Sequence, residues 1–262
     1  MADRFDLVVR GGTVVTASTR VRADVGICGG LIEAVGDGLA AGDAEIDATG
    51  NLVMPGGVDP HCHIEQMSGM GLLNADTFET ATRSAAMGGT TTVVSFAAQH
   101  GGQRLKDVVA DYAARARRGA MIDHAFHMIV SDPDQTALTQ DLPALIEAGH
   151  RSIKIFTTYN IRLDDRQVLD VMAVARRHGA LVCIHAENDG LIGWTKDQLL
   201  GAGMTRPAHH AMSHPRLAEI EAVERMIRFA EFLDQPIMLF HISTAEAVDA
   251  VRRARARGLP VW

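Results

Sequence analysis

The spacing of short apolar runs divides this chain into two regions. Up to about residue 54, the runs are separated by pairs of glycines, Gly11-Gly12 and Gly29-Gly30. Glycines between short apolar runs are typical of β-strands joined by tight turns. We therefore predict a small sheet here, which begins with a strand at 5–10, a turn, and a second strand at 13–16. About fifty residues of short strands form a sheet too small to bury both of its faces alone.

From residue 56 onward, apolar runs alternate with stretches of helical periodicity. The predicted strands are 58–64, 90–98, 124–130, 152–158, 180–186 and 236–243. The predicted helices are 75–87, 103–118, 137–148, 166–178, 217–233 and 244–257. Alternating strands and helices indicate an α/β protein with a parallel sheet, and this spacing favours a (β/α)8 TIM-type barrel over a doubly wound sheet.

The number of predicted strands stops short of a closed barrel. Residues 259–262 look like the opening of a seventh strand, whereas a closed barrel of this type needs eight. An open barrel would expose edge backbone groups and its apolar interior. We therefore expect about six and a half strands of a barrel, and we interpret the chain as a piece of a longer protein.

Composition and charge exclude several classes of partner. The 262 residues are 47% hydrophobic and 22% charged, as in an ordinary soluble globular protein. The net charge of −7 comes without a long Lys/Arg run, which argues against nucleic-acid and membrane partners. The sequence has no apolar span of about 18 residues and no signal-peptide pattern, so we expect a cytoplasmic protein. Three scattered cysteines do not make a disulfide framework and fit a reducing compartment.

The candidate chemistry lies at the ends of the predicted strands. His61 and His63 are two residues apart, so on a strand both imidazoles point to one face and Cys62 to the other. A His-x-His pair alone is a weak signal, because strand histidines are often simply hydrogen-bonded. However, His185 and His241 end two further strands, and Lys154 lies among apolar residues on the fourth. Functional side chains of (β/α)8 enzymes come from such strand ends, and imidazole is a common metal ligand.

These motifs closely resemble the dihydropyrimidinase and hydantoinase family, cyclic amidohydrolases of the metal-dependent amidohydrolase superfamily. The resemblance covers essentially the whole chain and rests on residues 54–63, 88–92, 152–156, 185–188 and 241–243. It implies two divalent metal ions, with zinc favoured by the imidazole-rich site, although manganese, cobalt and nickel bind such ligands too.

In that family the metal-bridging lysine is carbamylated, that is, N-carboxylated. The resemblance assigns this role to Lys154, with His61 and His63 holding one metal and His185 and His241 the other. The chemistry is consistent, because a protonated lysine repels a dication whereas a carbamate is an anion with two oxygens. Two metals that share a hydroxide can supply a nucleophile near neutral pH.

The implied reaction opens a 5,6-dihydropyrimidine or a 5-substituted hydantoin to an N-carbamoyl amino acid, as in pyrimidine catabolism. Tyr159, five residues after Lys154, would be the substrate-binding and catalytic donor to the developing oxyanion. An amphipathic rim tyrosine is the alternative interpretation. Allantoinases and dihydroorotases share the metal framework without this tyrosine and remain an alternative. A non-catalytic scaffold relative remains another, although this segment keeps every expected ligand.

The resemblance also implies a domain organisation and an oligomeric state. Residues 1–54 would form the N-terminal part of a β-sandwich, and residues 55–262 an incomplete (β/α)8 metal-hydrolase barrel without its C-terminal portion. The family's metal-binding aspartate at strand eight would lie beyond this chain. Family members are commonly tetramers or dimers, so we expect a homo-oligomer that acts on a small cyclic amide.

Other residues are weaker candidates. His127 either points into the barrel near the metals or is a hydrogen-bonded interior histidine, and His124 should face the other side of the strand. Residues 209–215 are rich in histidine, and we interpret them as a solvated loop in preference to a metal-binding segment. Cys62 should be a packing residue. Residues 67–73 form either a loop over the site or an ordinary connector.

Overall fold

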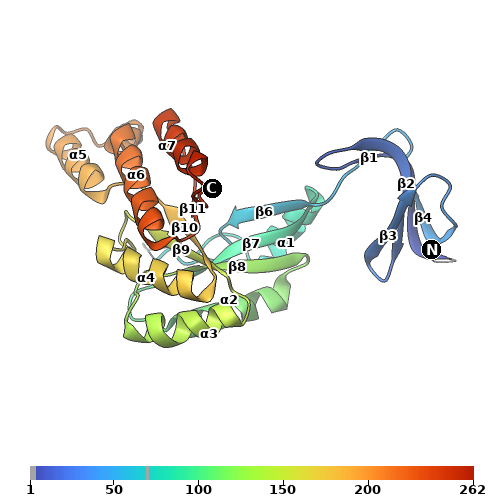
Figure 1. The fold of residues 1–262 in the computed structure, drawn as a ribbon, viewed down its shortest axis with the longest axis horizontal. Coiled ribbons are helices and arrows are strands. Elements are labelled where there is room, and N and C mark those ends of the chain that lie inside the picture. The colour runs from blue at the N-terminus through green and yellow to red at the C-terminus, as the bar shows by residue number, and fades with distance from the viewer. Residues whose placement is uncertain (1–3, 69–70) are drawn as a thin grey trace. The chain divides into compact units, whose positions relative to one another are not determined.

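The structure is a computed structural model that describes residues 4–68 and 71–262 (Figure 1). The chain forms two compact units, Met1–Gly57 and Val58–Trp262. The first is a sheet without helices among its described residues, and the second alternates strands and helices. The two units are described separately below.

The first unit is a mixed sheet with a very small core. Its strands follow the order β3-β2-β1-β4, with β5 also paired to β1, and β1 is antiparallel to β2 but parallel to β4 and β5. The bounds are β1 (Phe5–Val15), β2 (Arg20–Cys28), β3 (Leu31–Gly36), β4 (Gly42–Asp47) and β5 (Leu52–Val53). The buried cluster contains Val14, Ala23 and Val25, and Leu31 and Ile32 are largely exposed. Phe5, Val8 and Ala48 are also buried. The sheet therefore buries little apolar surface of its own, as its size predicted.

The predicted turn at Gly11-Gly12 is wrong, because β1 runs through it as one continuous strand. The pairing of β1 with β2 shifts register between Val9 and Gly12, which is a β-bulge. Gly11 takes a φ of +64° there, a conformation that glycine adopts without steric cost, and its N–H donates to Asp24 Oδ1 at 2.9 Å. The glycine bends the strand instead of reversing it.

The second unit is a six-stranded half-barrel. Its strands pair in sequence order from β6 to β11, and each described pair from β7 to β11 is parallel. The bounds are β6 (Gly57–Cys62), β7 (Thr90–Ala98), β8 (Asp123–Ile129), β9 (Ser152–Phe156), β10 (Leu181–His185) and β11 (Ile237–Leu239). Beyond β11, Val261 forms a parallel bridge to Ile237, so the predicted opening of a seventh strand is confirmed.

The helices alternate with the strands along the chain (Figure 1). They pack against the sheet and against neighbouring helices. Their bounds are α1 (Phe78–Met87), α2 (Leu105–Gly119), η1 (Ala137–Asp141), α3 (Leu142–Glu147), α4 (Asp165–His178), α5 (Asp189–Gly201), η2 (Pro207–Ser213), α6 (Arg216–Leu233) and α7 (Ala245–Ala256). Helix α5 was not predicted, and η2 is a 3-10 helix where a loop was expected. Of the helices in the described residues, none has the length and apolar character needed to cross a membrane.

One continuous apolar core joins the helices to the sheet. Phe96 of β7, Met128 of β8 and Ile155 of β9 are fully buried in it, together with Val171 of α4 and Met226 of α6. Because parallel strands share one direction, their carboxyl ends lie along the same edge of the sheet. The packed core thus holds that edge in a defined geometry.

Candidate metal centre at the strand ends

The carboxyl edge of the half-barrel brings the four predicted histidines together. The ring centroids of His61 and His63 are 5.5 Å apart, and those of His61 and His241 are 5.0 Å apart. His185 lies 4.6 Å from His241 by the same measure. Three different strand ends therefore supply one unbroken row of neighbouring imidazoles.

Lys154 lies buried inside the half-barrel. Its side chain is almost fully buried, with 1% of its surface exposed, and Nζ has no partner among the described residues. Nζ lies over the rings of Phe240 and Phe156, 4.2 and 4.8 Å from their centroids. Burial lowers the lysine pKa to about 7. An unpaired buried amine is costly, so its retention calls for an explanation.

Two of the histidines are held in the neutral form. Burial, and after it the charge of Lys154, lowers the pKa of His61 to about 4 and that of His241 to about 3. Both imidazoles are therefore uncharged at neutral pH. A neutral imidazole has a free nitrogen lone pair, which is the state that binds a metal ion.

The other two histidines each have one ring nitrogen already occupied. His63 Nδ1 lies 2.8 Å from Gln66 Oε1, and His185 Nε2 lies 2.7 Å from Glu187 Oε2. An imidazole that donates from one nitrogen presents a lone pair on the other, so these bonds orient the rings as metal-ligating histidines are usually oriented. Gln66 and Glu187 were not predicted as site residues. The only signal in the sequence was that each lies within three positions of a proposed ligand.

Backbone strain gathers at the same edge. Glu65, Tyr159 and His241 have φ values of 50°, 70° and 45°, in the left-handed region that is uncommon for residues with a Cβ. Each lies just beyond the end of β6, β9 or β11. The fourth described case, Asp234, caps the end of α6. Such strain persists where surrounding structure holds it, and it clusters at functional sites.

The four histidines alone do not make a metal centre. Within the described residues, no three His, Cys, Asp or Glu side chains are grouped so that they could hold an ion on their own. Lys154 as a free amine adds a cation and no ligand. As an N-carboxylate it would add two anionic oxygens next to His61 and His241, the two histidines whose pKa values it already influences.

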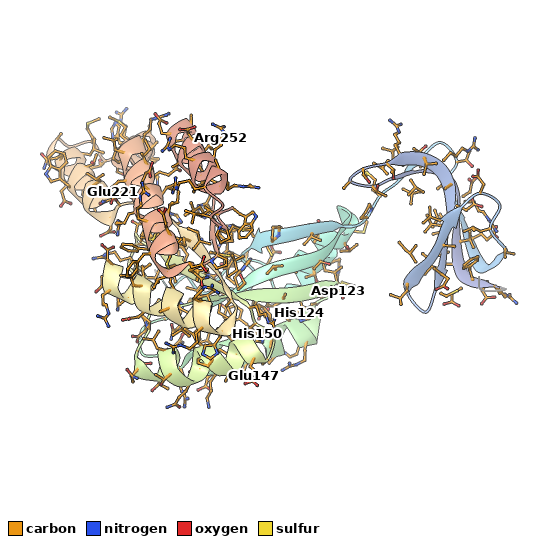
Figure 2. All side chains as sticks on the ribbon, in the orientation of Figure 1. Asp123, His124, Glu147, His150, Glu221 and Arg252 are labelled. Atoms are coloured by element: carbon orange, nitrogen blue, oxygen red, sulfur yellow. The ribbon has the colours of Figure 1, made fainter. Side chains whose placement is uncertain are left out.

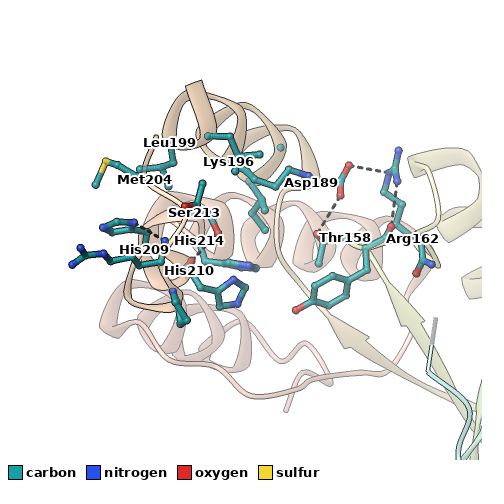
Figure 3. A pocket seen from close by; sticks show the side chains of 18 residues that line it. Thr158, Arg162, Asp189, Lys196, Leu199, Met204, His209, His210, Ser213 and His214 are labelled. Carbon is teal, nitrogen blue, oxygen red and sulfur yellow. Dashed lines mark hydrogen bonds and ion pairs between the residues drawn. The ribbon is translucent and has the colours of Figure 1, made fainter. Parts of the chain in front are cut away.

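Tyr159 lies beside His185 and borders a cavity of about 640 Å³, whose other lining residues include Thr158, Arg162 and Asp189 (labelled in Figure 3). Its ring centroid is 5.0 Å from that of His185, edge to face. Burial and the charge of Glu187 raise the pKa of its phenol, so it keeps its proton at neutral pH and can donate a hydrogen bond. Its carbonyl accepts a hydrogen bond from Arg162, which also forms an ion pair with Asp189 at 3.1 Å.

Two of the weaker candidates are structural. His127 uses both ring nitrogens, with Ser152 Oγ at 2.5 Å and the Pro60 carbonyl at 2.8 Å, so it is the hydrogen-bonded interior histidine. His124 lies on the other face of β8, with its ring 6.0 Å from that of Phe126, and Figure 2 labels it.

The remaining weaker candidates lie elsewhere in the second unit. Cys62 packs against the core, and burial raises its thiol pKa to about 11. Within residues 209–215, His214 reaches Glu187 with Nδ1 3.0 Å from Oε1. The predicted loop 67–73 includes residues 69–70, outside the described residues, and Met67 bridges Leu73 across it.

Comparison with known proteins identifies relatives in sequence and in fold. The sequence profile of the amidohydrolase family matches residues 52–259. A D-hydantoinase from Streptomyces coelicolor is 43% identical over 97% of this chain and 56% of its own length. A solved D-hydantoinase aligns with a TM-score of 0.94 and 38% identity, over 98% of this chain and 56% of its own. A solved D-hydantoinase (dihydropyrimidinase) from Thermus sp. aligns at 0.92 and 33%, with the same coverage. This chain spans about half the length of these relatives, and the predicted TIM-type fold is confirmed.

Proposed function

This chain belongs to the amidohydrolase family, and from that premise we propose that the protein hydrolyses a cyclic amide. The substrate would be a 5,6-dihydropyrimidine or a 5-substituted hydantoin, and the product an N-carbamoyl amino acid. Several relatives are named D-hydantoinases, and members of this family are typically metal-dependent. We extend the proposal to a homo-oligomer, which rests on the family resemblance alone.

The observation that carries the proposal is the unpartnered amine of Lys154. With a pKa near 7, a substantial fraction of the amine is uncharged at physiological pH. The uncharged Nζ can add to dissolved carbon dioxide, which forms one N–C bond and releases one proton. The resulting carboxylate, together with His61, His63, His185 and His241, would supply the ligands for two divalent ions.

When bound, two divalent ions would polarise the ring carbonyl and supply an activated water near neutral pH. The other tasks fall to side chains of this chain. Tyr159 would donate its phenolic proton in a hydrogen bond to the carbonyl oxygen as that oxygen gains charge. Phe96 stacks on His63 at 4.4 Å and Phe240 packs on His61 at 4.6 Å, so these apolar rings would help to hold the two imidazoles in place.

Tyr159 separates the proposed substrate class from its main alternative. An allantoinase or dihydroorotase would share the ligand set, and a scaffold relative would share only the fold. The test is an assay of the purified protein at the full length of its relatives, since the expected strand-eight aspartate lies beyond this chain. The protein is supplied with zinc and bicarbonate and tested against dihydrouracil, a 5-substituted hydantoin, allantoin and dihydroorotate. We expect turnover of the first two. Turnover of allantoin or dihydroorotate instead would reassign the substrate, and a metal-loaded protein inactive on all four would support the scaffold alternative.

A further inference from the structure

Glu187 links His185 to a second histidine from a distant part of the chain. Its Oε2 lies 2.7 Å from His185 Nε2, and its Oε1 lies 3.0 Å from His214 Nδ1. We infer that Glu187, braced by His214, is a positioning residue that fixes the tautomer and ring orientation of His185 for metal binding. This inference rests on the proposed function, because it concerns one ligand of the proposed metal centre.

The tautomer follows from the chemistry of the carboxylate. An ionised carboxylate only accepts hydrogen bonds, so both histidines must donate to it. His185 therefore carries its proton on Nε2, and its lone pair lies on Nδ1, the nitrogen turned away from Glu187. A carboxylate behind a metal-ligating histidine also raises the basicity of that ligand.

Glu187 is itself fixed to the neighbouring strand. Its N–H donates to Thr157 Oγ1 at 2.9 Å, and its carbonyl accepts from the same hydroxyl at 2.7 Å. Thr157 follows directly after β9, three residues beyond Lys154. The hydroxyl thus ties the ends of β9 and β10 together, and the position of Glu187 is set relative to both His185 and Lys154.

His214 lies outside the barrel strands and holds the second oxygen of Glu187. It follows η2, its ring centroid lies 5.0 Å from that of His210, and both rings line the cavity beside Tyr159 (Figure 3). Holding Oε1 of Glu187 prevents the carboxylate from rotating away from His185. The side chains of all three members, His185, Glu187 and His214, are only 14–21% exposed, so water competes weakly for these bonds.

The first test is zinc affinity, measured by competition with a chelator on the purified protein. In Glu187→Ala we expect affinity at one of the two zinc positions to fall by about 10- to 100-fold, the usual cost of removing such a partner. Glu187→Gln keeps one acceptor for His185 and should fall less, and so should His214→Ala. Glu221→Ala is the matched control, because this carboxylate lies on nearby α6 and contacts Asn188 and Arg225 without contacting His185 (Figure 2).

The second test reads the tautomer without metal. In the metal-free protein labelled with ¹⁵N-histidine, we expect His185 to be protonated on Nε2, and to lose that preference in Glu187→Ala. Unchanged zinc affinity in folded Glu187→Ala, or a proton on Nδ1 of His185, would overturn the inference. A wild-type protein that binds no zinc would overturn the proposed function instead, and the tautomer would then decide the inference by itself.

Discussion

Two buried polar regions inside the half-barrel have opposite hydrogen-bonding states. Around His127 on β8, both ring nitrogens are paired, to Ser152 and to the Pro60 carbonyl. Around Lys154 on the neighbouring β9, the amine has no partner among the described residues, and the adjacent His61 and His241 are held neutral. The first region is complete within the chain and serves the fold. The second costs stability in the chain alone, which is typical of a site that binds something from outside it.

The largest expected effect is that of Lys154→Met, which removes the unpaired amine from the second region. Loss of the proposed bridging ligand should lower kcat/KM by about a thousandfold or more, since such sites supply several kcal/mol of transition-state stabilisation. In the metal-free protein the same change should raise the free energy of unfolding by about 1–3 kcal/mol, because an unpaired buried amine is removed. Denaturant unfolding in chelator measures the second effect. Undiminished turnover, or a less stable metal-free protein, would contradict the account.

Tyr159→Phe should have the next largest effect. If Tyr159 is the proposed oxyanion donor, its removal should lower kcat by about 10²- to 10³-fold and leave the metal content the same. The chain offers a matched control in Tyr112→Phe, because Tyr112 is its only other tyrosine and is buried in α2. Steady-state kinetics on the preferred substrate compares the two variants. Equal losses in both would mean that Tyr159 acts through the fold and not at the substrate.

His127→Leu probes the paired region. The change removes the partner of the Pro60 carbonyl and leaves the Ser152 hydroxyl with Cys183 Sγ alone, so the free energy of unfolding should fall by about 1–3 kcal/mol. Metal content should not change. His124→Leu, on the opposite face of β8, should alter stability by less than about 0.5 kcal/mol. If His127→Leu released metal while the protein stayed folded, His127 would belong to the site.

The last expected effect is a dependence of stability on pH. Because the pKa of Lys154 is about 7 in the folded protein against an ordinary value of 10.5, the unfolded chain binds more protons between these values. The stability of the metal-free protein should therefore gain a rising component from pH 7 toward pH 10.5. This component should vanish in Lys154→Met. Thermal melts of both proteins across that range measure the difference, and parallel pH profiles would be the contrary result.

The order and direction of the barrel strands could be predicted because each is an apolar run followed by a helical pattern. Two local features could not. Gly11 allows both a turn and a bulge, and only pairing along the whole of β1 decides between them. Helix α5 buries Ile192 alone, so it lacks the apolar stripe that identifies a helix, and its Asn188 cap is a local signal that was overlooked.

The proposed ligands could be identified because they recur at strand ends, whereas their supporting partners could not. Glu187 and His214 are 27 positions apart, and no pattern within one segment indicates that they meet. His127 remained ambiguous for the same reason, since Pro60 lies 67 positions away. Long-range hydrogen bonds depend on how the strands curve, which apolar periodicity does not report.

Metal content tests the central claim most directly. The protein is purified from cells supplied with zinc and bicarbonate, together with Lys154→Met and His127→Leu, and metals are counted by elemental analysis. The account predicts about two ions per chain in the wild type and in His127→Leu, and few or none in Lys154→Met. A folded wild-type protein without metal, or a Lys154→Met variant that keeps both ions, would contradict it.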